Sequence, residues 1–486
     1  MGAMRKTFLS NLLLLIGINL LIKPFYLLVI EASIQERLGP DAYGMYFALL
    51  NISFILNILP DIGITNWNNR HVASNGIIHA SQFQKLIRIR ILLGLVYLLV
   101  CTGVGLFMDY EEHALSWLIV LAFNQVLSTG VLFLRSYLTG MHAFASDRFV
   151  SILDRLLLIG MMGAALLWIP RDDVFPISYF IYGQTIAYGV TLLVSFILVI
   201  RLTSKEGKSE ALSTDTILTS SLPFALLIFF SMISGRVDAV MLERMKGSFD
   251  AGIYAMAFRL GDMLTMISYL FAVLLLPMFS RQLANGEQPR ELFGISFRLL
   301  LTGCVCVALI SMFQAEYILN ILYSEHTTEA AMVLPWTIGA AVMFSLQYAT
   351  GTLLTAGHNM KLLIVVALLS LLVNLTLNTK LIPYCGAVGA AQAAFMTQTF
   401  VFLIQAVFIQ KYYRVWTMKL LIQSTLFIAV SILSATLIAG ANLSAVLTLL
   451  SITGAVVFIG ILSKMLPVRD IKKILPTTNH QVTEES

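Results

Sequence analysis

The stretch GRVDAVMLERMKGSFDAGIYAMAFRLGD, residues 235–262, places four charged side chains inside segments that are otherwise apolar enough to cross a membrane. Arg236 and Asp238 lie in one apolar run, and Arg259 and Asp262 lie in the next. A charge at the centre of a membrane helix costs about 2.5 to 3.5 kcal/mol on insertion scales. We therefore expect these four residues to have a function.

The composition identifies the broad class of the protein. Of the 486 residues, 58% are hydrophobic and 12% are charged, whereas soluble domains carry about 25% charged residues. The sequence therefore predicts an all-α polytopic membrane protein. The net charge of +5 is modest and follows the predicted topology, so we expect no nucleic-acid partner.

Fourteen apolar runs approach the length of about 20 residues that a membrane helix needs. They cover residues 8–30, 44–66, 86–108, 114–138, 149–169, 175–200, 217–242, 252–279, 292–315, 331–356, 361–380, 386–410, 418–439 and 443–463.

Lysine and arginine are distributed unequally between the two sides of these runs. The side that holds the N-terminus has 22 of them, and the opposite side has five. By the positive-inside rule, both termini are predicted to be cytoplasmic, which agrees with an even number of spans.

A repeat divides the chain into similar halves. Glu36-Arg37 recurs as Glu243-Arg244 at an offset of 207, and Gly44-x-Tyr46 recurs as Gly252-x-Tyr254 at an offset of 208. Six spans per copy is an even number, so the copies would share one orientation, with a site at their interface. We predict a first six-helix lobe over residues 1–202, a linker over 203–216, a second six-helix lobe over 217–412, two further helices over 413–464 and a tail over 465–486.

Several motifs resemble one family of membrane transporters. They are Arg37-Leu38-Gly39-Pro40 with Tyr43-Gly44-x-Tyr46, Leu222-Pro223 followed by Asp238, Gly252-x-Tyr254, Leu276-Pro277, and NLTLNTKLIPYCGAVGAA at residues 374–391. Together they resemble the polysaccharide-transporter branch of the multidrug/oligosaccharidyl-lipid/polysaccharide (MOP) exporter superfamily, and within it the bacterial O-antigen-type (Wzx) flippases.

This resemblance implies a fourteen-helix transporter with two lobes. Its substrate would be an oligosaccharide linked to undecaprenyl pyrophosphate, moved from the cytoplasmic to the periplasmic leaflet of the inner membrane by alternating access. The implied partners are this lipid-linked glycan, membrane lipid and the polysaccharide polymerase machinery.

Three cations within the spans are candidates for binding the anionic lipid pyrophosphate. Lys23, Arg236 and Arg259 would offset its desolvation if they faced the lumen. In the alternative interpretation Lys23 and Arg236 extend toward the membrane surface, while Asp262 neutralises Arg259 three residues away on the same helix.

Acidic residues in the spans are candidates for coupling or gating: Asp61, Asp238 and Asp262. Asp61 lies in Leu59-Pro60-Asp61-Ile62-Gly63, where proline and glycine would break the helix. Its alternative role is to cap a helix end. Asp238 would either pair between lobes or carry a coupling proton.

Amide and tyrosine side chains complete the candidate set. Asn374, Asn378 and Gln347 are polar lumen candidates, and interhelical hydrogen bonds are their favoured role. We expect Tyr43, Tyr46 and Tyr254 to anchor the outer membrane interface.

The sequence does not favour an enzyme. It has no glycine-rich phosphate loop and no metal-ligand spacing, so we expect neither a metal nor a cofactor. Two alternatives to a flippase remain. One is a MATE-like drug or cation antiporter of the same superfamily, and the other is a membrane polysaccharide polymerase or ligase.

Overall fold

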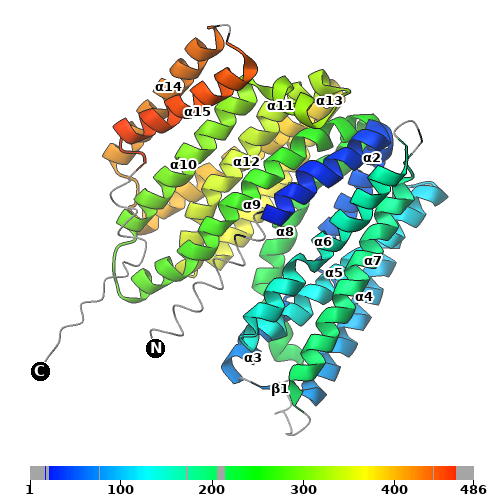
Figure 1. Cartoon of the computed structure of the whole chain (residues 1–486). Helices are drawn as coiled ribbons and strands as arrows, with labels where there is room; N and C mark the ends of the chain where they lie inside the picture. Colours follow the sequence, from blue (N-terminus) through cyan, green and yellow to red (C-terminus); the bar gives the residue numbers. More distant parts are fainter. Residues whose placement is uncertain are drawn as a thin grey trace, which may run out of the picture. The chain divides into compact units, whose positions relative to one another are not determined.

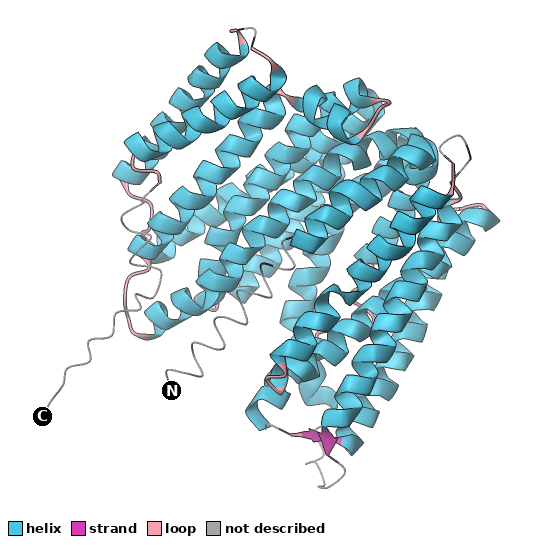
Figure 2. Ribbon diagram, viewed as in Figure 1, coloured by secondary structure: helices cyan, strands magenta, loops and turns pink. Residues whose placement is uncertain are grey.

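The computed structural model describes residues 17, 21–75, 77–170, 173, 175–204, 214–441 and 443–466, and they are almost entirely helical (Figures 1 and 2). Most of the predicted first span, most of the linker and nearly all of the predicted tail lie outside the described residues. In chain order the elements are η1 (Tyr26–Glu31), α2 (Ala32–Ile55), α3 (Ile64–Asn75), β1 (Ile78–His79), α4 (Ala80–Phe107), α5 (Glu112–Gly140), α6 (Phe144–Trp168), α7 (Ile177–Leu202), β2 (Thr203–Ser204), α8 (Thr214–Lys246), α9 (Ser248–Ala284), α10 (Arg290–Phe313), α11 (Ala315–Leu322), α12 (Thr327–Ala356), α13 (Met360–Tyr413), α14 (Met418–Ala439) and α15 (Ala445–Leu462).

Eleven of the described helices are long and apolar enough to cross a membrane. The longest, α13, has 54 residues and non-helical backbone angles at Gly386, so it corresponds to the two predicted spans 361–380 and 386–410. The predicted span 44–66 is divided between α2 and α3. Exposed leucines on α4, such as Leu92 and Leu99, give that helix the apolar outer surface expected of a lipid-facing element.

The chain divides into two compact units. The first takes in Met1–Met263, Leu319–Thr337 and Met360–Thr397, and the second takes in Leu264–Ile318, Ile338–Asn359 and Gln398–Ser486. The predicted lobe boundaries at 202 and 217 stay predictions.

In the first unit, α5 packs against α3, α4, α6 and α7 (Figure 1). Their shared core is apolar and includes Phe83, Phe133, Tyr137, Leu138 and Val199, all buried. The strands β1 and β2 pair in parallel beside the starting end of α4 and the final end of α7 (Figure 2).

In the second unit, α10 packs against α14 and α15. Trp416, between α13 and α14, lies edge-on to Phe293 and Phe297 of α10, with ring centroids 5.1 and 4.9 Å apart. This aromatic contact ties the loop before α14 to α10.

The helix break predicted around Asp61 is present. The α-helical hydrogen bonding of α2 ends at Ile55, a series of turns follows, and α3 begins at Ile64. Ile62 and Gly63 both have positive φ, at 43° and 80°. Proline and glycine therefore break the span as the sequence predicts.

The two copies of the repeat have the same backbone turn at the same register. Gly39 lies inside α2 with a φ of 72°, and Gly247 separates α8 from α9 with a φ of 98°. The two glycines are 208 residues apart, the offset at which Gly-x-Tyr recurs. A side chain would strain the backbone at either position, so glycine is required at both.

These repeated segments also contact each other through glycine. A Cβ on Gly44 would lie 1.8 Å from the carbonyl oxygen of Ser248, and a Cβ on Gly252 would lie 2.1 Å from that of Pro40. Pro40 and Ser248 are themselves 208 residues apart, so the two contacts are equivalent under the repeat. The backbones of α2 and α9 can approach this closely only because both positions lack a side chain.

We expect Gly44→Ala to destabilise the protein, because overpacking in a tight contact typically costs about 1 to 3 kcal/mol. The matched control is Gly103→Ala in α4, where an added Cβ meets nothing within 4 Å. The thermal midpoint of each variant in detergent, followed by size-exclusion chromatography, should fall for Gly44→Ala alone. Equal midpoints for the two variants would contradict the contact.

Candidate functional site

The first unit encloses a polar cavity of about 210 Å³. It is lined from η1, α2, α5, α6, α7, α8 and α9, and we call it the central cavity. Its charged lining residues are Glu31, Arg155, Arg236, Arg259 and Asp262. Three cations thus face two acids, so the lining carries a net positive charge.

Arg259 is the most deeply buried of these cations, with 5% of its side chain exposed. Its guanidinium lies 3.5 Å from the carboxylate of Glu31 and donates hydrogen bonds to the hydroxyl of Tyr43 and to the carbonyl of Leu27. A buried charge requires such partners because its desolvation is costly. Arg259 is therefore fixed by groups on η1 and α2.

Glu31, the acidic partner of Arg259, lies in a π-helix. Glu31 ends the π-helix η1, and its Oε1 accepts a hydrogen bond of 2.8 Å from the hydroxyl of Tyr43. π-Helices are rare and frequently occur at functional sites. Here the π-helix also supplies Tyr26 and Leu27 to the cavity lining.

Arg236 and Asp262 form the second ion pair of the cavity, at 3.4 Å. The side chains are 25% and 41% exposed, respectively. The Arg236 guanidinium lies 5.2 Å from the ring of Phe54 and 5.3 Å from that of Phe258. Both ion pairs of the cavity join different helices, whereas the alternative considered from the sequence was a local pair of Arg259 and Asp262 within one helix.

Arg155 is a cavity cation that is not among the candidates predicted from the sequence. Because α6 begins at Phe144, Arg155 lies about three turns into it. Its guanidinium is 4.8 Å from the ring of Tyr26, and it donates a hydrogen bond of 3.5 Å to the hydroxyl of Tyr188. The predicted span starts at residue 149, five residues after α6 does, so it places Arg155 nearer to the helix end than the structure does.

Lys23 lies in the helical residues just before η1 and is half-buried. It is outside the lining of the central cavity, but within electrostatic range of Arg155 and Asp154. The structure thus brings Arg236 and Arg259 together in one cavity and places Lys23 apart from them.

Asp238 and two asparagines form a separate buried cluster. Asp238 on α8 accepts hydrogen bonds from Asn374 at 2.9 Å and Asn378 at 2.6 Å, both on α13. The favoured prediction for these asparagines, interhelical hydrogen bonding, is confirmed. Both partners of Asp238 lie in the predicted second lobe, and a coupling role for it stays a prediction.

Gln347 in the second unit also makes an interhelical hydrogen bond. Its Nε2 on α12 donates to Oε1 of Gln398 on α13 at 2.9 Å. A direct contact with sugar stays a prediction for all three amides.

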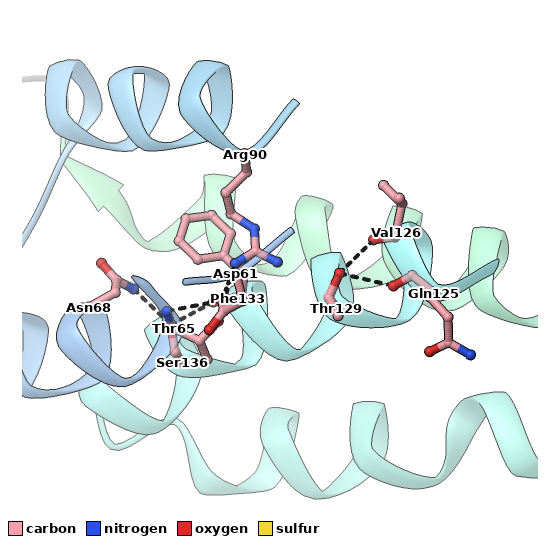
Figure 3. Close-up of polar contacts among 9 residues, drawn as sticks. All are labelled: Asp61, Thr65, Asn68, Arg90, Gln125, Val126, Thr129, Phe133 and Ser136. Carbon is pink, nitrogen blue, oxygen red and sulfur yellow. Dashed lines mark hydrogen bonds and ion pairs between the residues drawn. The ribbon is translucent and has the colours of Figure 1, made fainter. Parts of the chain in front are cut away.

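Asp61 lies in a third polar cluster (Figure 3). Its carboxylate forms an ion pair with Arg90 and accepts a hydrogen bond of 3.2 Å from the backbone N–H of Thr65 in the first turn of α3. The Arg90 guanidinium also lies 4.7 Å from the ring of Phe133. The predicted capping role of Asp61 is therefore confirmed, and its role in gating stays a prediction.

The prediction for the tyrosines was wrong. Tyr43, Tyr46 and Tyr254 are 1% to 2% exposed, so they do not anchor a membrane interface. Tyr43 and Tyr46 line the central cavity instead, and Tyr46 accepts a hydrogen bond of 2.7 Å from Gln184. No signal in the sequence indicates that Gln184 of α7 contacts Tyr46 or that Arg259 of α9 contacts Tyr43.

A family model described as polysaccharide biosynthesis protein matches residues 8–283. The chain belongs to this family. No curated protein matches the chain in a sequence search.

Solved structures of this fold include transporters of the MOP superfamily. The lipid II flippase MurJ in an inward closed conformation is similar over 94% of this chain and 100% of its own, at 14% identity and a TM-score of 0.69. An outward-facing multidrug resistance MATE family transporter is similar over 83% of this chain and 94% of its own, at 14% identity and a TM-score of 0.54. A MOP superfamily transporter from Pyrococcus furiosus has the same identity and coverage and a TM-score of 0.55.

The family and the fold confirm several predictions made from the sequence. The protein is an all-α multi-pass membrane protein with a MOP-type transporter fold. Its fold is the one found in the solved MOP superfamily transporters. The central cavity is the candidate functional site.

We expect the single variants Arg259→Gln and Glu31→Gln each to lower the thermal midpoint strongly. Breaking one partner of a buried pair typically costs about 3 to 5 kcal/mol, since the other charge stays buried. The double variant should lose less than the sum of the two, as coupled residues do. The control is Arg201→Gln at the exposed end of α7, which should leave the midpoint unchanged. Additive losses would show that Arg259 and Glu31 do not stabilise each other.

Proposed function

We propose that this protein is a flippase for lipid-linked oligosaccharides. It would move an undecaprenyl-pyrophosphate-linked repeat unit from the cytoplasmic to the periplasmic leaflet of the bacterial inner membrane by alternating access. The product would serve O-antigen, capsule or exopolysaccharide biosynthesis. Both chain termini would be cytoplasmic, and the polysaccharide polymerase machinery would act on the translocated unit.

The net positive central cavity is the observation that carries this proposal. A pyrophosphate that enters a membrane protein loses its hydration, and guanidinium groups can replace that hydration with charge-assisted hydrogen bonds. Arg236 is suited to this role because its side chain is still 25% exposed while its ion pair with Asp262 holds it in place.

The size of the cavity limits what it would hold. At about 210 Å³ it is smaller than the roughly 300 to 1,000 Å³ of sites for drug-sized ligands. It would therefore take the charged head group with adjoining sugar atoms, rather than a whole oligosaccharide. The family membership and the MurJ-like fold support a lipid-linked cargo.

A MATE-like drug or cation antiporter is the main alternative within the superfamily. A site for cations is expected to favour acidic residues, whereas the lining here holds Arg155, Arg236 and Arg259 against Glu31 and Asp262. The charge balance therefore favours an anionic substrate.

Deleting the gene and measuring which leaflet holds the lipid-linked repeat unit tests the proposal directly. We expect the unit to accumulate in the cytoplasmic leaflet. Unchanged sidedness with altered polymer length alone would refute flipping and favour a polymerase. Unchanged glycan with increased drug sensitivity would favour the antiporter.

Arg236→Ala is expected to lower transport in the same leaflet assay while still inserting into the membrane. Loss of a charge-assisted hydrogen bond of about 1.5 to 3 kcal/mol corresponds to a fall of roughly tenfold or more. Arg201→Ala removes an exposed cation at the end of α7 and should transport normally. Normal transport by Arg236→Ala would show that this guanidinium does not bind the substrate.

A further inference from the structure

The second unit contains another cavity, of about 500 Å³, where α10 and α14 both begin. Two segments that are far apart in the sequence line it: residues 288–298 at the start of α10, and residues 415–420 at the start of α14. We call it the basic pocket. Its lining includes Arg290, Glu291, Arg298, Thr417 and Lys419.

Cations predominate in the basic pocket. Arg290, Arg298 and Lys419 face it, against the single carboxylate of Glu291. Arg290 and Lys419 are exposed, so neither is committed to the protein core. The pocket is thus open to a ligand and carries a positive charge.

Arg298 is only partly satisfied by the protein. Its Nη2 donates a hydrogen bond of 3.3 Å to Gln423 of α14. Its buried Nε–H has no hydrogen-bond partner among the described residues. An unpaired guanidinium N–H is costly to bury, and an anionic oxygen is the partner that would satisfy it best.

The walls of the pocket are fixed by packing. The indole of Trp416 lies edge-on to Phe293 and Phe297, and its N–H donates to the carbonyl of Ala406 at 3.0 Å. The neighbouring side chain of Thr417 accepts a hydrogen bond of 2.9 Å from the backbone N–H of Leu420 and so caps α14. Two helix N-termini, each with a partial positive charge, therefore meet at a rigid site.

We propose that the basic pocket binds a phosphate group at the membrane surface, supplied by the head group of an anionic phospholipid. The location favours this ligand, because both helices that begin at the pocket are candidate membrane spans and a phospholipid phosphate lies at that depth. Basic pockets between the ends of membrane helices are suited to such head groups. The site is distinct from the central cavity and does not depend on what that cavity transports.

The test compares the full chain with the double variant Arg290→Gln/Lys419→Gln in nanodiscs of phosphatidylcholine mixed with phosphatidylglycerol. After extraction into detergent, the phosphatidylglycerol that stays bound to each chain is quantified. We expect wild type to retain it and the double variant to bind about fivefold less per cation removed. The matched control is Arg281→Gln/Lys411→Gln, which removes two exposed cations outside the pocket lining and should behave as wild type.

A second arm separates the two sources of phosphate. Inorganic phosphate is titrated into the detergent-solubilised wild type and double variant by calorimetry. Retention of phosphatidylglycerol that depends on the pocket supports a lipid head group. Binding of inorganic phosphate that depends on the pocket, without lipid retention, supports a phosphate site supplied from solution. If neither ligand distinguishes wild type from the double variant, the proposal is wrong.

Discussion

The burial of Arg259 is the constraint on which the central cavity depends. A guanidinium with 5% exposure in a membrane protein must have partners that stay in place. Tyr43, one of these partners, is the neighbour of Gly44, and Arg259 follows Gly252 by two helical turns on the same face. The glycine contact that lets α2 and α9 approach therefore also sets the distance across which Tyr43 reaches Arg259. The repeated glycine contact thus helps to hold the buried Arg259 beside its partner Tyr43.

Features encoded by local sequence were predictable. Pro60 and Gly63 break a span because one lacks a backbone donor and the other adopts positive φ, and the structure has the break where the sequence places it. The spans follow from the length of the apolar runs, and the interhelical role of Asn374 and Asn378 follows from the cost of an unpaired amide in an apolar environment.

Features that depend on which helices meet were not predictable. Tyr43, Tyr46 and Tyr254 look like interface anchors in the sequence, since aromatic residues near span ends usually are. Their burial is caused by neighbours from elsewhere in the chain, such as Gln184 on α7. Arg155 was missed for a different reason: its depth depends on where α6 begins, and the apolar run starts later than the helix. Glu31 joins the cavity only through the π-helix, for which the sequence shows no signal.

The predicted coupling acids of the first unit differ in their exposure, and this difference separates candidates for a fixed structural role from a candidate that a ligand in the central cavity could reach. Asp238 accepts two amide hydrogen bonds and is 3% exposed, and Asp61 combines an ion pair with helix capping. Rearranging either would break several interactions at once, which suits a fixed structural role. Asp262 is 41% exposed, and it forms an ion pair of 3.4 Å with Arg236 at the wall of the central cavity. An anion that bound Arg236 would compete with this carboxylate, whereas Arg259 would keep Glu31 as its partner. Of the predicted coupling acids, Asp262 is therefore the one whose environment a substrate in the central cavity would change most directly.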